Sequence, residues 1–346
     1  MKKVVTFGEV MLRLQPEGHK RLVQGGVLQT SFAGAEANVA VSVSNLGIRS
    51  EFVTSLPAGN PLTTRCLNEL RGYGVETSHV VLSGARIGTF YMECGSNMRP
   101  SKVFYDRENS SIATLPPGSI DWEEVLRDAT WFHWSGITPA ISDNAAKNCL
   151  DAIRTANKLG VCVSCDINYR GTLWKYGKTA SEVMPELVAC TDVIIGNEED
   201  CYKVFGIQPA EFDAEKTGGE IDACSFIYVC SEMQKRFPRA HTLALTLRGA
   251  ISADHNTWQA VLYRDGQLYN SARYNLTDIV DRVGAGDSFS GSLIYALSSE
   301  MEPQCALEFA TAASALKHTI VGDYNCVTHD EVMHLVKGGS SGRVSR

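Results

Sequence analysis

The 346-residue chain has 44% hydrophobic and 21% charged residues, so it can bury a large core and lacks the composition of a disordered protein. A net charge of −7 gives no basic footprint for nucleic acid or an anionic membrane, so an anionic substrate would need positive groups supplied locally. No apolar run reaches the roughly 18 residues of a membrane helix, and the start is too polar for a signal peptide. Eleven irregularly spaced cysteines indicate reduced thiols, so we expect a cytoplasmic protein.

Strand and helix patterns alternate along most of the chain. A strand pattern at residues 3–9 opens it, and a helical pattern at 35–47 follows. We then expect strands at 51–56, 79–83, 130–136, 161–168, 192–196, 242–248 and 257–270, and helices at 60–72, 142–159, 179–190, 197–205, 284–299 and 303–320. This alternation predicts an α/β, doubly wound, mostly parallel sheet with helices on both faces. Such sheets bind ligands beyond the carboxyl ends of their strands.

Two segments break the alternation. Residues 11–15 directly follow the first strand, and residues 88–107 have the pattern of a hairpin with a polar turn. Neither has a helix to cover it, so we expect a small β-sheet lid, built from about 10–33 and 86–108, that excludes water from a site. The alternative is a surface hairpin without a function.

The chain contains no internal repeat and no low-complexity linker. We therefore expect one continuous domain over residues 1–336. The remaining residues, 337–346, are rich in glycine and serine and are predicted to form a flexible tail.

The strongest chemical signal is "DRVGAGDSFSG" at residues 281–291, which we expect to end a strand, turn and open a helix. Gly284 and Gly286, with Ala285 between them, would leave backbone N–H groups at the helix start that bind an anion. A carboxylate, Asp287, stands in the same place and would repel an anion. It fits if it accepts the proton of a hydroxyl that attacks a phosphoryl group held by those donors. The alternative is that it merely caps the helix.

Other nucleotide signatures are absent from the sequence. There is no GxxxxGK[ST] phosphate loop, and no GxGxxG follows the first strand. A kinase must therefore use a different scaffold.

Two segments together resemble the paired signatures of the ribokinase-like, or PfkB, carbohydrate kinases. They are "AGAEANVAVSVSNLG" at 33–47 and "DRVGAGDSFSG", and the resemblance runs from about residue 3 to 336. It implies a ribokinase-like fold with a β-lid, a first segment that approaches the sugar, and a 284–287 backbone that forms an anion hole. It also implies that Asp287 is the catalytic base.

The finer resemblance is to 2-keto-3-deoxygluconate kinases, on Glu36 and on "VFYDR" (103–107), "FHWSGITPA" (132–140), "DINYRGTLW" (166–174) and "GDYN" (322–325). It implies ATP-dependent phosphorylation of 2-dehydro-3-deoxy-D-gluconate at its terminal C6 hydroxyl, with the gluco or galacto epimer undecided. The alternatives are a kinase for another sugar, such as fructose, and a catalytically inactive sugar or nucleotide sensor.

The resemblance also assigns ligand roles. The sugar acid would contact Gly34, Asn38, Tyr91, Tyr105, Arg107, Arg170 and Asp323. The nucleotide would contact Asn168, Arg170, Asn197, Thr246, Arg248, Gly249, Gly284 and Gly286. The arginines supply planar charged forks suited to carboxylates and phosphates. Mg²⁺ would act through water on Asp200 or Glu199, a monovalent cation is a further candidate, and the lid is expected to mediate a homo-oligomer.

Three positions depart from the family pattern. Asp200 stands where glutamate is usual, and Arg248 stands where glycine is expected. Arg282 replaces a smaller residue, and its side chain can point away from the site.

Overall fold

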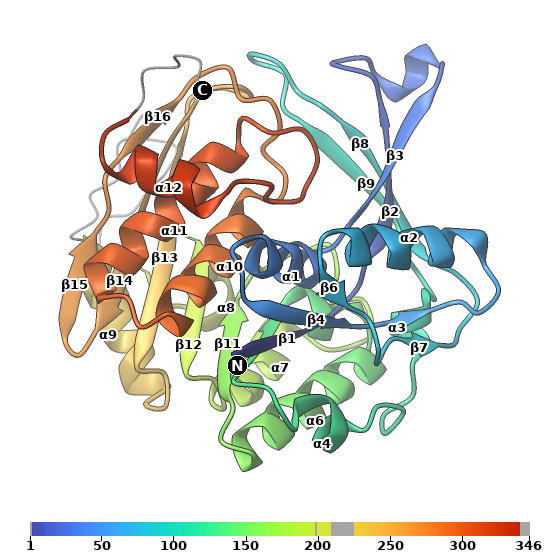
Figure 1. The fold of residues 1–346 in the computed structure, drawn as a ribbon, viewed down its shortest axis with the longest axis horizontal. Coiled ribbons are helices and arrows are strands. Elements are labelled where there is room, and N and C mark those ends of the chain that lie inside the picture. Colours follow the sequence, from blue (N-terminus) through green and yellow to red (C-terminus); the bar gives the residue numbers. More distant parts are fainter. Residues whose placement is uncertain (1, 198, 209–224, 340–346) are drawn as a thin grey trace.

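The computed structural model describes residues 2–197, 199–208 and 225–339, and its centre is one large twisted sheet (Figure 1). In spatial order the strands are β15 (Gln267–Asn270), β14 (Asn256–Arg264), β13 (Thr242–Ala250), β12 (Val193–Asn197), β11 (Cys162–Asp166), β10 (Trp131–Ser135), β1 (Lys3–Phe7), β4 (Arg49–Val53) and β6 (Val75–Glu76), with β16 (Tyr274–Leu276) paired to β14. All neighbours from β13 to β6 are parallel, and β14 pairs antiparallel with β13, β15 and β16. The predicted α/β fold with a mostly parallel sheet is confirmed.

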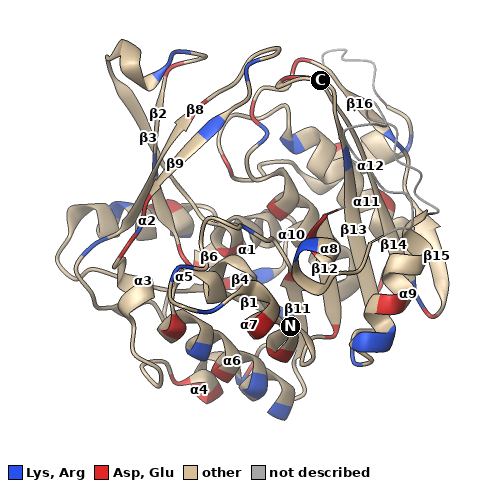
Figure 2. Ribbon diagram, turned by 180° about the vertical axis from the view of Figure 1, so that it is seen from behind, with Lys and Arg blue, Asp and Glu red and all other residues tan. Residues whose placement is uncertain are grey.

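The central strands are apolar on both sides because helices cover both faces of the sheet. Along β1, Val4 packs into the core on one face, whereas Val5 and Phe7 pack into the core on the other. The first face is covered by α1 (Ala35–Asn45), α10 (Ala285–Ser298), α11 (Pro303–Lys317) and α12 (His329–Val336). The second is covered by α6 (Asp143–Lys158), α7 (Ala180–Val188), α8 (Asp200–Phe205) and α9 (Phe226–Arg236). Outer helices such as α6 and α9 carry charges of both signs (Figure 2).

A second sheet stands over one end of the main sheet (Figure 1). Its strands, in order, are β3 (Leu28–Ala33), β2 (Met11–Pro16), β8 (Gly88–Glu93) and β9 (Lys102–Asp106). They lie within the two segments predicted for the lid, so the expected small sheet is present. Its strand β3 was not predicted as a strand.

The remaining elements are short or peripheral. They are the 3-10 turn Leu22–Gln24, β5 (Ser55–Leu56) paired with β7 (Val81–Leu82), α2 (Pro61–Gly72), α3 (Ser111–Thr114), α4 (Trp122–Leu126) and α5 (Ile137–Ile141). None of the helices within the described ranges is long and apolar enough to cross a membrane.

Several predicted boundaries differ from the structure. The strand expected at 51–56 divides into β4 and β5, and the strand expected at 257–270 is the hairpin β14–β15. Its turn is Asp265–Gly266, where both residues have positive φ, as a tight hairpin turn requires. The strand expected directly before the glycine turn is wrong, because residues 277–283 form a loop. Most of the predicted tail at 337–346 lies outside the described residues.

Candidate active site

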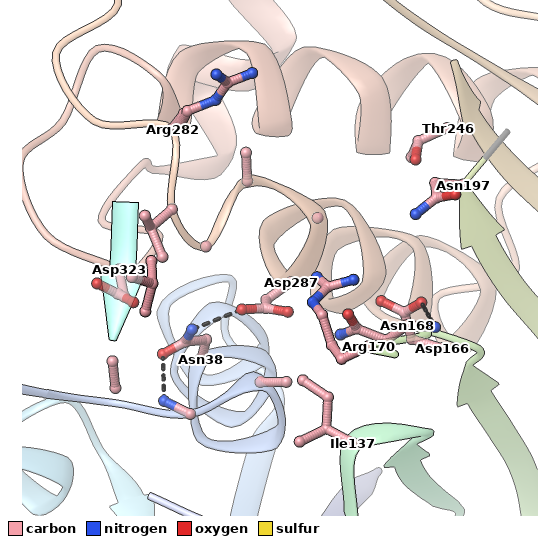
Figure 3. A pocket seen from close by; sticks show the side chains of 18 of the residues that line it. Asn38, Ile137, Asp166, Asn168, Arg170, Asn197, Thr246, Arg282, Asp287 and Asp323 are labelled. Atoms are coloured by element: carbon pink, nitrogen blue, oxygen red, sulfur yellow. Dashed lines mark hydrogen bonds between the residues drawn. The ribbon is translucent and has the colours of Figure 1, made fainter. Parts of the chain in front are cut away.

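A cavity of about 490 Å³ lies at the carboxyl ends of the main-sheet strands, between that sheet and the lid. This is where an open α/β sheet binds its ligands, beside the strand β1 at which the strand order reverses. The predicted site residues that line it are Gly34, Asn38, Tyr105, Asn168, Arg170, Asn197, Asp200, Thr246, Arg248, Gly284, Ala285, Gly286, Asp287 and Asp323. Side chains from α1, β11, α10 and the loops beside them converge there (Figure 3).

The glycine turn forms the start of α10. Gly284 has φ 79°, a left-handed conformation that favours glycine, and it occupies the N-cap position of the helix. A Cβ on Gly284 would come within 2.1 Å of the Asp323 carbonyl oxygen, so the packing leaves no room for a side chain at this position. A Cβ on Gly286 would meet no atom of the described residues within 4 Å, and Gly286 lines the cavity. The first backbone N–H groups of a helix have no partner inside it, so this turn offers donors to an anion in the cavity.

Asp287 lies in the first turn of α10 and points towards α1 (Figure 3). The side-chain amide of Asn38 donates to its Oδ2 at 2.6 Å. Burial raises the pKa of Asp287 to about 6, helped by the charge of Asp323, while the Asn38 hydrogen bond and the charges of Arg170 and Lys317 oppose the rise. Because Gly284 is the N-cap, Asp287 does not hold the capping position. A carboxylate with this pKa is poised to accept a proton near neutral pH.

Replacing Asn38 by leucine should move the acid limb of the kcat profile to higher pH. Wild-type kcat should fall as pH drops through about 6, because protonated Asp287 cannot accept a proton. The substitution removes a hydrogen bond that favours the carboxylate, so the pKa of Asp287 should rise further. A kcat–pH profile measures this. Asn45→Leu, at the exposed far end of the same helix, is the control, and an equal shift in both variants would contradict the assignment.

Two further acidic groups line the cavity beside the ends of β11 and β12. Asp166 ends β11, and burial together with the charges of Asp200 and Asp287 raises its pKa well above the ordinary value. Asp200 begins α8, where its Oδ1 accepts from the Tyr169 N–H at 3.1 Å and its Oδ2 from the Asn197 N–H at 2.9 Å. Its pKa is also raised by burial. Two buried carboxylates with raised pKa values, one of them raised in part by the charge of the other, form an environment that a divalent cation would stabilise.

Arg170 is the positive group among these carboxylates. It is exposed into the cavity beside Asp287 (Figure 3), and its charge lowers the pKa of Asp166, Asp200 and Asp287. Its guanidinium donates to the Tyr169 carbonyl at 2.9 Å, and within the described residues it forms no ion pair. Its charge is therefore available to an anionic ligand.

Two arginines line another part of the cavity. Arg248, from β13, and Arg282, from the loop before α10, lie close enough that the charge of Arg248 helps burial to lower the pKa of Arg282. Arg282 does not point away from the site, as the sequence suggested it could. Thr246, two residues before Arg248 in β13, also lines the cavity, with its hydroxyl donating to the Gly196 carbonyl at 3.3 Å. A pair of cations held together suits a polyanion such as a polyphosphate.

The structure does not bring four predicted residues to the cavity. β8 pairs Phe90 with Tyr105, which places these two on the cavity face and turns Tyr91 to the opposite face. Arg107 is buried, and its Nε donates to Glu9 at 2.7 Å. The other two are Gly249, which is buried within β13, and Glu199, which pairs with Lys203. Of the two carboxylates proposed for the metal, Asp200 is the one that lines the cavity.

Glu36 and Gly34 support the site from within the fold. Glu36 is buried and does not line the cavity; its Oε1 accepts from the Ser135 N–H at 3.1 Å, the Ser135 hydroxyl at 2.7 Å and the Thr138 hydroxyl at 2.7 Å. These bonds tie the start of α1 to the end of β10, while burial raises the pKa of Glu36 to about 7. Gly34 lines the cavity, but a Cβ there would come within 1.9 Å of the Glu9 carbonyl oxygen, so close backbone packing already requires glycine.

Among the lining groups that were not assigned from the sequence are one carboxylate and two apolar side chains of the lid. Asp166 opens "DINYR" and directly ends a buried strand, and this position was a signal that could have been used. Phe90 and Met92 provide the apolar cover from the lid, and only the pairing register of β8 and β9 shows which side they face.

Fold and cavity together define an α/β enzyme with a lid over a site at the strand ends. A family model described as pfkB family carbohydrate kinase matches residues 1–223 and 259–330. The chain therefore belongs to the pfkB family of carbohydrate kinases.

Similar proteins include a 2-dehydro-3-deoxygalactonokinase of Haloferax volcanii, 33% identical over 98% of each chain. A solved 2-dehydro-3-deoxygluconokinase of Thermotoga maritima is 42% identical, with a TM-score of 0.92 over 98% of this chain and 100% of that one. A putative ribokinase II of E. coli, solved with ATP and Mg²⁺, is 18% identical with a TM-score of 0.78 over 98% and 100%, and it shares the fold.

Proposed function

We propose that this kinase transfers a phosphoryl group from ATP to the terminal C6 hydroxyl of 2-dehydro-3-deoxy-D-gluconate. The observation that carries the substrate class is the guanidinium of Arg170, which lies in the cavity beside Asp287 and forms no ion pair with any residue that the structure describes. Such a fork suits the carboxylate of an open-chain sugar acid, which a neutral hexose lacks. Two relatives named as kinases of 2-dehydro-3-deoxy sugar acids, one for each epimer, support this class.

In the proposed reaction, the oxygen of the C6 hydroxyl bonds to the γ-phosphorus of ATP, and Asp287 accepts the proton of that hydroxyl. The bond from that phosphorus to the bridging oxygen of ATP breaks, and ADP leaves. Backbone N–H groups of the 284–287 turn hold the transferring group, and the side chain of Asn38 orients the base. Phe90 and Met92 of the lid limit the access of water, which could otherwise accept the phosphoryl group.

The carboxylates at the ends of β11 and β12 fit Mg²⁺, because they are buried, close together and face the cavity. Asp200 would hold the ion through water with Asp166 beside it, and the ion would neutralise charge on the ATP phosphates. Arg248 and Arg282 would meet the phosphates of the nucleotide, with Asn168, Asn197 and Thr246 nearby.

A coupled ADP-release assay with both epimers of the keto-deoxy acid, fructose and ribose tests the substrate. We expect the highest kcat/KM with a keto-deoxy acid. Faster turnover of fructose or ribose would assign the enzyme to another sugar, and no turnover of any sugar would favour an inactive sensor.

Replacing Arg170 by leucine should raise the KM for the keto-deoxy acid by about 10- to 100-fold, the effect of losing a charge-assisted hydrogen bond. The KM for a neutral sugar should change far less, because it has no carboxylate. Arg248→Leu is the matched control, since it should alter the KM for ATP more than that for the acid. Equal losses for acid and neutral sugar in Arg170→Leu would contradict the assigned role.

The lid is also proposed to mediate a homo-oligomer. The edge strand β9 is exposed along its whole length and carries Val103, Phe104 and Tyr105, and an exposed edge of this kind can pair with another copy. Light scattering of the native chain and of Phe104→Lys tests this, since the charge should shift the population towards monomer.

A further inference from the structure

A buried lysine that the proposed chemistry does not use lies next to the anion-hole turn. Lys317 ends α11, and its side chain is fully buried. Its ammonium donates to the backbone carbonyl of Asp281 at 3.2 Å and to that of Ile320 at 3.3 Å. These carbonyls belong to the loop that leads into Gly284 and to the loop that packs against it.

The two loops meet under close constraint. The Asp281 side chain accepts from the Val283 N–H and from the Gly322 N–H, each at 3.1 Å, so it spans both loops. Gly284 also packs closely on the second loop, since a Cβ there would come within 2.1 Å of the Asp323 carbonyl oxygen. A group that fixes the Asp281 and Ile320 carbonyls therefore fixes the position of the turn that holds the phosphoryl group.

The surroundings of the ammonium are those of a small cation site. Converging backbone carbonyls are the oxygens that replace water around a bound K⁺. The buried carboxylates Asp281 and Asp323 face two buried cations, Lys317 and Arg13 of the lid strand β2, and the charge of Asp287 also acts on Lys317. Arg13 pairs with Asp281 at 2.7 Å and also with Asp323. Asp281 and Asp323 therefore already have cationic partners that belong to the chain itself.

We infer that Lys317 is a built-in monovalent cation that positions the anion-hole turn, so that turnover needs no K⁺ or Na⁺. The inference rests on the proposed phosphoryl transfer at the 284–287 turn. It makes Lys317 a positioning residue, since its ammonium contacts backbone carbonyls and does not line the cavity. Its charge also favours the ionised form of Asp287 by lowering the pKa of that carboxyl.

The first experiment uses the native chain. Its turnover is measured in buffers of equal ionic strength whose only monovalent cation is K⁺, Na⁺ or tetramethylammonium, with Mg²⁺ held constant. We expect rates within about twofold of one another, because a tethered ammonium cannot exchange with ions in solution. Activation by K⁺ of tenfold or more over tetramethylammonium would overturn the inference.

The second experiment removes the ammonium of Lys317 from its place beside the two carbonyls. Lys317→Ala should lower kcat by about 10²-fold in tetramethylammonium, as a displaced catalytic turn does, and K⁺ or ethylammonium should restore a large part of it. Lys3→Ala is the control. Lys3 is also buried, and its ammonium donates to the Val125 carbonyl at 3.4 Å. It lies at the amino end of β1, whereas the cavity lies at the carboxyl ends of the strands. The control should lose stability without any cation-dependent change in kcat.

Two further measurements separate a positioning role of the Lys317 ammonium from a role in packing alone. The melting temperature of Lys317→Ala should rise with K⁺ while that of the native chain does not, and this needs no substrate. Lys317→Gln keeps a donor for the carbonyls but loses the charge, so the acid limb of its kcat profile should move to higher pH. Absence of both effects would leave Lys317 with a packing role only. Failure of the substrate assignment would instead appear as poor turnover of the keto-deoxy acid by the native chain.

Discussion

Asp287→Asn should lower kcat by about 10²–10⁴-fold, the usual contribution of a positioned general base. The amide has nearly the same shape and can still bond to Asn38, but it cannot accept the hydroxyl proton. The KM for either substrate should change little, since the backbone donors of the turn remain. Steady-state kinetics with the keto-deoxy acid and ATP measure the effect.

The stability of the same variant separates catalysis from folding. Burial raises the pKa of Asp287 above its ordinary value, so the native state binds the proton more tightly than the unfolded chain does. Asp287 therefore makes the native enzyme lose stability as the pH rises from about 4 to about 6, and the full loss remains above pH 6; asparagine removes that loss. The melting temperature of the variant at pH 7 should be equal to or above that of the native chain. A nearly unchanged kcat would show that Asp287 is not the base.

Most of the fold could be predicted because the strands of a two-sided sheet are short apolar runs separated by amphipathic helices. The lid strand β3 (Leu28–Ala33) was not predicted, because its first half is exposed at a sheet edge and its buried and exposed residues do not alternate. Helix α9 (Phe226–Arg236) was not predicted either, although the sequence has a helical pattern there: its buried residues are spaced three and four apart.

The site could be predicted where its chemistry is local in sequence. The turn at 284–287 forms the start of a helix, and the segment "DINYR" begins at the last residue of a strand, so their positions follow from the fold. Tyr91 and Arg107 could not be placed, because the face of a lid strand and the pairing of Arg107 with Glu9 depend on tertiary register. Glu36 was recognised as unusual, but its hydroxyl partners lie about a hundred positions away in the chain.

The two glycines of the anion-hole turn should respond in opposite ways to alanine. Gly284→Ala introduces a side chain at φ 79° and within 2.1 Å of the Asp323 carbonyl oxygen. Left-handed strain and overpacking together should cost about 2–5 kcal/mol of unfolding free energy. Urea unfolding measures this loss, and a stability equal to that of the native chain would contradict the observed packing.

Gly286→Ala should leave the fold intact and still damage catalysis. In the part of the chain that the structure describes, the added Cβ meets no atom within 4 Å, and alanine is a better helix residue than glycine. The free energy of unfolding should therefore stay equal or rise slightly. The methyl group would occupy the space where the transferring phosphoryl group is held, and kcat/KM should fall by about 10²-fold or more because alignment is lost. Gly72→Ala, at the end of α2 with equally open space, is the control: its free energy of unfolding should likewise stay equal or rise slightly, and kcat/KM should not change. A Gly286→Ala enzyme with native kcat/KM would mean that the phosphoryl group does not approach this turn, and the base at Asp287 would then lack its reaction partner.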